Sequence, residues 1–133
     1  QNNILIVLNS KLIKFKDSEP NPSQKAKYSK NINSNKKYAE MTFSKQEVES
    51  FAALSGDLNS IHLNSEPVVQ GMLILLIFED ILAQNNRFAE KIIIKYFRKN
   101  KVDQKIKLFE VENSRFFALL DNKINFEINI KEI

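Results

Sequence analysis

The segment between Gly56 and His62 carries the residue types best suited to chemistry in this chain. Asp57 and His62 stand five residues apart with Asn59 between them, and His62 is the only histidine among the 133 residues. A carboxylate and an imidazole that lie close together can bind a water molecule and move its proton. A lone histidine near a carboxylate is also a common structural or surface feature. The spacing alone therefore leaves both interpretations open.

A second candidate group lies at Gln70 and Gly71, where an apolar helix is predicted to begin. The first N–H groups of a helix have no partner within the helix, and the helix dipole places partial positive charge there. Such a helix end can stabilise a developing oxyanion. Gly71 would equally suit a place where the chain packs closely, and the residues themselves do not decide between the two.

The composition excludes several other kinds of site. The absence of cysteine excludes a disulfide scaffold, a thiolate metal site and a cysteine nucleophile, and a single histidine excludes a multi-histidine metal site. Two glycines are too few for a glycine-rich phosphate-binding loop. No apolar run reaches the roughly 18 residues of a membrane span, and no signal-peptide pattern is found. We therefore expect a cytoplasmic protein without membrane association.

The length and the charge distribution indicate one domain with two unlike portions. The chain has the usual size of a single domain, so we expect residues 1–133 to form one. Residues 1–37 hold eight lysines against two acidic residues, diluted by asparagine and serine. Few arginines and aromatic residues accompany them, which favours a solvated, loop-rich portion over nucleic-acid binding. Residues 38–133 are then the core of the domain, and we expect no nucleic-acid partner.

Two helices are predicted to flank the Asp57–His62 segment. Residues 44–47 read SKQE, a capping box in which serine and glutamate each satisfy a free N–H group of the helix start. A helix is expected over residues 45–54, ending at Gly56 because glycine permits the left-handed conformation that ends helices. The second helix is expected over residues 71–84. It is apolar on every face, so most of its sides should be covered.

The remaining segments are predicted as strands and loops. Residues 4–16 suggest two strands or one bent strand, and residues 17–37 suggest a long loop. Four strands are expected in the last third of the chain, with turns at 113–114 and 121–122: residues 91–98, 105–111, 115–120 and 123–130. A fully apolar helix followed by such a meander indicates an α+β fold in which a curved antiparallel sheet wraps around the helix.

The combined pattern resembles one known family. Residues 43–62 read FSKQEVESFAALSGDLNSIH and resemble the signature of the MaoC-like, (R)-specific enoyl-CoA hydratase family. Residues 68–73, VVQGML, resemble the entry into that family's central hot-dog helix, and residues 95–99, KYFRK, resemble the strand that follows. The resemblance covers roughly residues 42–100. A D-x-N-x-x-H motif after a helix that ends in S-G-D is far more specific than the aspartate and histidine alone.

The resemblance implies a hot-dog fold, usually dimeric, and a lyase activity in fatty acid metabolism. Family members hydrate trans-2-enoyl thioesters of CoA or acyl carrier protein to (R)-3-hydroxyacyl thioesters, or dehydrate in reverse. It implies that Asp57 and His62 hold and activate the water, and that Asn59 fixes the loop. The Gly71 N–H would bind the thioester carbonyl oxygen. No metal or redox cofactor is implied, and a homodimer that binds acyl-CoA or acyl-carrier protein is expected.

Three departures from the family pattern bear on the site. Ser60 replaces a common proline, Gln70 replaces a common histidine that lines the substrate site, and only eight residues separate His62 from Gly71. Arg98 and Lys99, with Lys101, are the cations expected to meet the phosphates of the carrier. The alternative function is a catalytically silent hot-dog subunit that binds acyl thioesters or supports a partner subunit. A thioesterase is less favoured, since the motifs of hot-dog thioesterases lack this spacing.

Overall fold

The structure is a computed structural model that describes residues 3–8, 11–16, 36–57 and 59–133. Most of the long loop expected over residues 17–37 lies outside the described residues, and Lys37 already belongs to a strand. The division into a basic portion over residues 1–37 and a core over residues 38–133 stays a prediction.

Five strands form one antiparallel sheet in the order β3-β5-β6-β7-β4. Their bounds are β3 (Lys37–Met41), β4 (Ala89–Tyr96), β5 (Ile106–Glu112), β6 (Arg115–Leu120) and β7 (Lys123–Glu132). The predicted meander of β5, β6 and β7 is confirmed. The turn between β6 and β7 has positive φ at Asp121 (52°) and Asn122 (61°), as a type I′ hairpin turn requires.

Two features of the strands differ from the sequence prediction. The strand expected over residues 91–98 spans Ala89–Tyr96, because the N–H groups of Phe97 and Arg98 both turn to donate to the Asn125 carbonyl. β3 was not predicted at all. It has five residues and two charged side chains, and only Met41 is buried, so it shows no clear apolar alternation.

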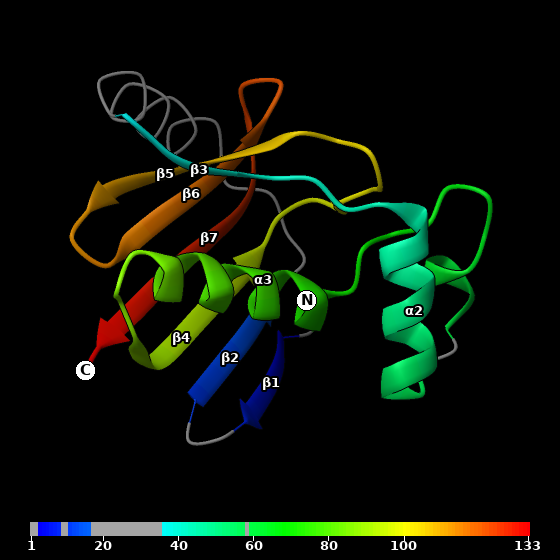
Figure 1. Cartoon of the computed structure of the whole chain (residues 1–133), viewed down its shortest axis with the longest axis horizontal. Helices are drawn as coiled ribbons and strands as arrows, with labels where there is room; N and C mark the ends of the chain where they lie inside the picture. Colours follow the sequence, from blue (N-terminus) through cyan, green and yellow to red (C-terminus); the bar gives the residue numbers. More distant parts are fainter. Residues whose placement is uncertain (1–2, 9–10, 17–35, 58) are drawn as a thin grey trace.

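The first sixteen residues contain a hairpin, which decides between the two arrangements that the sequence left open. β1 (Asn3–Leu8) pairs antiparallel with β2 (Lys11–Lys16) in a two-stranded sheet. β2 lies beside β4 at the margin of the larger sheet (Figure 1).

Three helical segments lie between β3 and β4: α2 (Lys45–Ser55), the 3₁₀ turn η1 (Ser60–His62) and α3 (Gly71–Gln84). The predicted capping box is present, because Ser44 Oγ accepts from the Glu47 N–H and Glu47 Oε1 accepts from the Ser44 N–H. α2 ends at Gly56 with φ 76°, a conformation that costs glycine little. In the described part of the chain, no helix is long and apolar enough to cross a membrane.

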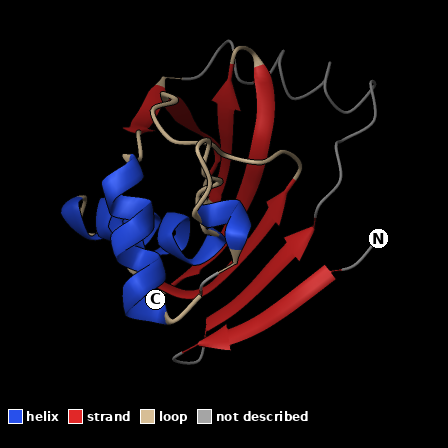
Figure 2. Cartoon of the chain, turned by 90° about the vertical axis from the view of Figure 1, so that its right-hand side faces the viewer, coloured by secondary structure: helices blue, strands red, loops and turns tan. Residues whose placement is uncertain are grey.

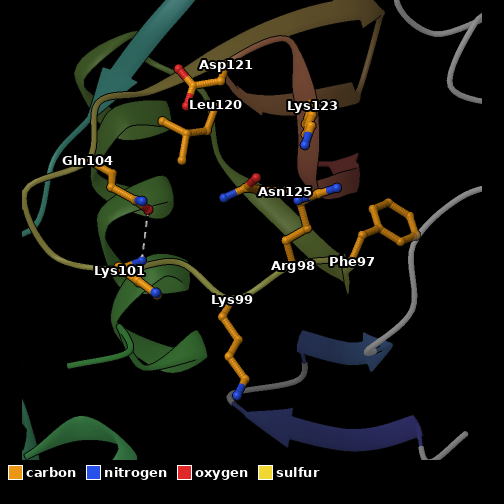
Figure 3. Close-up of a pocket in the computed structure, with 9 residues that line it drawn as sticks. All are labelled: Phe97, Arg98, Lys99, Lys101, Gln104, Leu120, Asp121, Lys123 and Asn125. Carbon is orange, nitrogen blue, oxygen red and sulfur yellow. Dashed lines mark hydrogen bonds between the residues drawn. The ribbon is translucent and has the colours of Figure 1, made fainter. Parts of the chain in front are cut away.

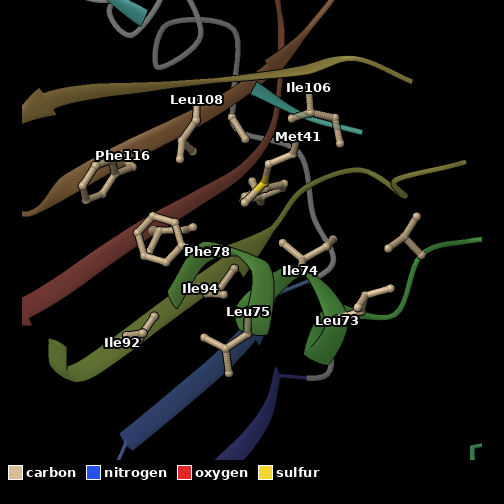
Figure 4. Close-up of a cluster of buried hydrophobic side chains, with 14 of the residues drawn as sticks. Met41, Leu73, Ile74, Leu75, Phe78, Ile92, Ile94, Ile106, Leu108 and Phe116 are labelled. Atoms are coloured by element: carbon tan, nitrogen blue, oxygen red, sulfur yellow. The ribbon is translucent and has the colours of Figure 1, made fainter. Parts of the chain in front are cut away.

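α3 fills the concave side of the sheet, as Figures 1 and 2 show. Ile74, Leu75 and Phe78 are fully buried and face apolar side chains of β4, β5 and β6 (Figure 4). The aromatic ring of Phe78 meets Phe116 edge-on at 5.1 Å between ring centroids. Leu76 is 43% exposed and shares the exposed face of this helix with Asp80, Ala83 and Gln84. The expected covering on most sides is therefore present.

A cluster of charged side chains lies beyond the carboxyl end of α3 and links the loop after this helix to two strands of the sheet. Arg87 donates to both carboxylate oxygens of Glu110 on β5, at 2.9 and 2.8 Å, and also to Glu132 on β7. The guanidinium also lies over the ring of Tyr38 on β3. Partial burial raises the pKa of Glu110, but hydrogen bonds from Arg87 and from the Ser114 N–H outweigh it and hold the pKa below its usual value.

The two adjacent leucines of α3 allow a matched test of this packing. Leu75 is fully buried whereas Leu76 is 43% exposed. We expect Leu75→Asp to abolish cooperative thermal unfolding, because an unpartnered carboxyl group in an apolar core costs several kcal/mol even when it takes up a proton, and the lost leucine packing adds to this, against a typical domain stability of about 5–15 kcal/mol. Leu76→Asp should unfold cooperatively within a few degrees of the parent, as circular dichroism can measure. A parental melting temperature for Leu75→Asp would contradict this placement of α3.

Candidate active site

The segment after α2 folds through two turns made by its own polar side chains. Asp57 Oδ1 accepts a hydrogen bond from the Asn59 N–H at 3.2 Å, and Asn59 Oδ1 accepts from the Ile61 N–H at 3.2 Å. Short Asp and Asn side chains readily bond the backbone two residues ahead. The second of these bonds also caps η1, which ends at His62. The alternation of Asp57 and Asn59 thus gives the loop its shape and delivers His62 beside Asp57.

The His62 ring is oriented by one hydrogen bond, and a carboxylate lies near its other nitrogen. It is 8% exposed, and its Nδ1 lies 2.6 Å from the Val68 carbonyl oxygen. Because a carbonyl oxygen only accepts, Nδ1 must carry the hydrogen and donate it. The Nε2 atom lies 3.4 Å from Oδ2 of Asp57, whose side chain is 48% exposed. In the neutral ring Nε2 therefore presents a lone pair towards a carboxylate that solvent can reach.

This arrangement suits the binding and deprotonation of water. A lone pair and a carboxylate oxygen that face each other repel unless a hydrogen-bond donor satisfies them. A water molecule can donate to both groups, and Nε2 is free to take its proton. The carboxylate of Asp57 then stabilises the resulting imidazolium by its charge. The pair can act as a general base in one direction of a reaction and as a general acid in the other.

The short segment 63–70 closes back onto η1 and onto the chain that follows β4. The Val68 N–H donates to the Ile61 carbonyl at 2.7 Å, and the Val69 N–H donates to the Asn100 carbonyl at 2.7 Å. Val68 also forms an isolated antiparallel bridge with Lys101. These contacts fix the Val68 carbonyl that holds His62. Within the described residues, no hydrogen bond joins His62 directly to Gly71; the chain from Val68 to Gln70 connects them.

Gln70 occupies the start of α3 and is 3% exposed. Its Nε2 donates to the Val48 carbonyl on α2 at 2.9 Å, which fastens the two helices together. Its Oε1 is buried and has no hydrogen-bond partner among the described residues. α3 begins at the next residue, Gly71, and no side chain in the described ranges caps the helix. The helix start therefore combines an unsatisfied acceptor with the free N–H groups of a first turn.

Arg98 and Lys99 lie away from this pair, in a basic pocket of about 460 Å³. Figure 3 shows the pocket between the segment that follows β4, which supplies Arg98, Lys99 and Lys101, and the β6–β7 hairpin, which supplies Lys123. The pocket residues Phe97, Gln104, Leu120, Asp121 and Asn125 complete the lining. Four cationic side chains against one carboxylate make a field that attracts anions, phosphate among them.

One residue of the pocket lining, Asn125, is hydrogen-bonded to a buried residue outside the lining. Asn125 Nδ2 donates to Asn100 Oδ1 at 2.9 Å, and both asparagines are buried. The same Asn100 holds Val69 through its carbonyl. The segment 97–101 therefore touches both the basic pocket and the stretch that orients His62.

Sequence reasoning paired Asp57 with His62, which the structure places 3.4 Å apart, but it did not identify the residues around them. Val68 contributes only its backbone carbonyl, which has no signature in the sequence. Lys123 and Asn125 reach the basic pocket from a distant hairpin, so only the tertiary fold brings them there. In the residues that the structure describes, no group of three His, Cys, Asp or Glu side chains could hold a metal ion.

The geometry at His62 predicts which ring nitrogen carries the hydrogen. In alkaline solution we expect the neutral ring to be protonated at Nδ1, the reverse of the form that free histidine prefers in water. Because the chain has one histidine, nitrogen NMR of histidine-labelled protein gives one pair of ring signals. Unfolding in urea should restore the ordinary mixture of the two forms. A folded ring protonated at Nε2 would contradict the contact with Val68.

Comparison with known proteins places the fold. No family model matches the chain, and no curated protein matches it. Among solved structures, the chain is similar to an (R)-hydratase from A. caviae involved in PHA biosynthesis, with a TM-score of 0.51 and 17% identity. The match covers 69% of this chain and 88% of that chain. The chain therefore has an α+β hot-dog fold, in which the antiparallel sheet wraps around α3.

Proposed function

We propose that the chain is an acyl-thioester hydratase or dehydratase that interconverts trans-2-enoyl and (R)-3-hydroxyacyl thioesters of CoA or acyl carrier protein. The observation that carries the proposal is the pair of Asp57 Oδ2 and His62 Nε2, 3.4 Å apart, with the opposite ring nitrogen tied to Val68. The fold shared with an (R)-hydratase supports a hydratase-like role.

In this mechanism the water lies to one side of the pair, within hydrogen-bond reach of both Asp57 Oδ2 and His62 Nε2. Its oxygen bonds to C3 of the enoyl group while one of its protons passes to His62 Nε2. The electrons of the double bond move towards the thioester oxygen, where the N–H of Gly71 stabilises the enolate charge. The imidazolium of His62 then gives this proton to C2, which restores the neutral ring and completes the addition of water. Dehydration follows the same steps in reverse.

The remaining site residues would bind the substrate. Gln70 has a buried, unsatisfied Oε1 at the start of α3. This oxygen can accept a hydrogen bond from an N–H group of the carrier arm that bears the thioester. Arg98 and Lys99 would bind carrier phosphates in the basic pocket. Both CoA and the prosthetic arm of acyl carrier protein carry phosphate, so the pocket fits either carrier.

The alternative is a silent hot-dog subunit that binds an acyl thioester without converting it. Two features favour this alternative. Segment 63–70 is short, and the amide nitrogen of Gln70 already donates its hydrogen bond to the Val48 carbonyl on α2. A displacement of about 1 Å between reacting groups can cost two orders of magnitude in rate. This alternative predicts binding without turnover, or turnover only with a second subunit.

A homodimer is part of the proposal. β3 ends the five-stranded sheet and pairs with one neighbour, β5, in the described sheet. The unpaired side of an edge strand can pair with another chain. Dimerisation and a cytoplasmic location stay predictions.

Activity should depend on both members of the acid–base pair. With crotonyl-CoA as substrate, we expect Asp57→Asn and His62→Gln each to lower kcat by at least about 100-fold, since each removes the proton acceptor or its stabilising charge. The loss of enoyl-thioester absorbance measures the rate, and circular dichroism checks that the variants are folded.

Parental rates in both variants would refute the proposed chemistry. If the parent protein binds crotonyl-CoA but leaves its absorbance unchanged, the silent subunit becomes the better description. The same assay should then be repeated with an enoyl-carrier protein before hydratase activity is abandoned.

The basic pocket should affect binding of the carrier rather than the chemical step. We expect Lys99→Glu to raise KM for crotonyl-CoA about tenfold at low salt, because it places a negative charge beside the phosphates. Crotonyl-pantetheine lacks the nucleotide and should show an unchanged KM. Lys107→Glu, on an exposed lysine of β5 outside the pocket, is the matched control. An equal rise in KM for both variants would contradict a specific phosphate site.

A further inference from the structure

Tyr96, the last residue of β4, donates a hydrogen bond from its hydroxyl to the Gly71 carbonyl at 3.0 Å. Its ring packs against Phe126 of β7, with 5.5 Å between ring centroids, and the two residues are direct partners across the sheet. Burial raises the pKa of the Tyr96 hydroxyl far above its usual value, so the group remains a donor throughout the physiological range. A rigid strand thus delivers a permanent donor to the first residue of α3.

The residue that receives this hydrogen bond needs outside support. Gly71 has no Cβ and is the first residue of a helix without a side-chain cap. The Ile74 N–H donates to the Gln70 carbonyl at 3.1 Å and so holds the peptide that carries the Gly71 N–H, but no side chain of Gly71 itself restrains the next peptide. The preceding residues are well fixed, because Val69 bonds Asn100 and the Gln70 side chain bonds Val48. The Tyr96 hydroxyl fixes the carbonyl of Gly71 itself.

A second observation indicates that this helix start faces a ligand site. Gln70 is 3% exposed, and its Oε1 has no partner in the described residues. A buried acceptor left unsatisfied costs about 1–3 kcal/mol, and a bound substrate group can satisfy it. The acceptor and the N–H of Gly71 belong to consecutive residues.

We infer that Tyr96 is a positioning residue: by anchoring the Gly71 carbonyl to β4 it fixes the start of α3, and with it the direction of the Gly71 N–H in the neighbouring peptide, which points at the thioester oxygen. The inference rests on the proposed function, which gives the Gly71 N–H its role. Tyr96 acts through Gly71 and needs no contact with the substrate. Donors that are oriented before the reaction stabilise developing charge without reorganising, which is why a fixed peptide matters here.

Tyr96→Phe tests the hydrogen bond itself without any need for activity. This variant keeps the ring against Phe126 and removes only the hydroxyl. The chain has two glycines, so protein labelled with ¹³C at the glycine carbonyl gives two signals. We expect the Gly71 signal to shift in Tyr96→Phe, because its oxygen loses a hydrogen bond, while the Gly56 signal stays. An unmoved Gly71 signal would overturn the inference.

Kinetics then test the positioning role. We expect Tyr96→Phe to lower kcat for crotonyl-CoA about tenfold and to change KM less than twofold, because the substitution misplaces a donor and leaves the substrate-binding groups unchanged. Tyr38→Phe removes a buried hydroxyl beside Phe116 and is the matched control for a purely structural effect. It should leave kcat at the parental level without lowering the melting temperature, because this hydroxyl has no hydrogen-bond partner among the described residues.

The possible failures can be told apart. A shifted Gly71 signal with parental kcat would show that the hydrogen bond exists but overturn the positioning role. Equal losses of kcat in Tyr96→Phe and Tyr38→Phe would overturn it as well. Absence of turnover in the parent protein with both crotonyl-CoA and an enoyl-carrier protein, with a shifted Gly71 signal, would reject the proposed function together with the role that depends on it.

Discussion

Helix α3 sets the constraint to which the rest of the domain conforms. Its residues are apolar on nearly every face, so the free energy of unfolding depends on covering most of them at once. Each fully buried large apolar side chain contributes about 1.5–3 kcal/mol. A flat sheet would cover one side of the helix, whereas the curved sheet β3-β5-β6-β7-β4 reaches around it. The position of Gly71, and with it the candidate site, follows from where this helix enters the sheet.

The sequence predicted those elements whose signals are local. The bounds of α3 and the start of α2 could be predicted because a capping box, a glycine in the left-handed conformation and an uninterrupted apolar run each act within a few residues. β3 could not, because it is a short edge strand whose pairing with β5 lies far along the chain. The end of β4 was displaced by two residues, since the backbone N–H groups of Phe97 and Arg98 bond to Asn125 rather than to a strand partner.

The candidate site divides in the same way. Asp57 and His62 could be paired in advance because the intervening turns are formed by side chains of the same short segment. The groups around them come from elsewhere: the Val68 carbonyl at His62, the Tyr96 hydroxyl at Gly71 and the Lys123 amine in the basic pocket. A backbone carbonyl carries no residue signature, and a tyrosine in a strand reads as ordinary core. Only the tertiary structure shows where these groups lie relative to the start of α3.

The two ends of α3 are held by different kinds of contact. The charged Arg87 cluster lies beyond its carboxyl end, and uncharged hydrogen-bonding groups surround its amino end. At the carboxyl end, Glu110 has a lowered pKa, so its stabilising effect is present above its ordinary pKa and is lost as the pH falls through the value in the folded state. At the amino end, Gln70, Gly71 and Tyr96 are held by hydrogen bonds between uncharged groups. Protonation of Glu110 therefore weakens the Arg87 cluster, whereas the hydrogen bonds of Gln70 and Tyr96 at the start of α3 involve no carboxylate.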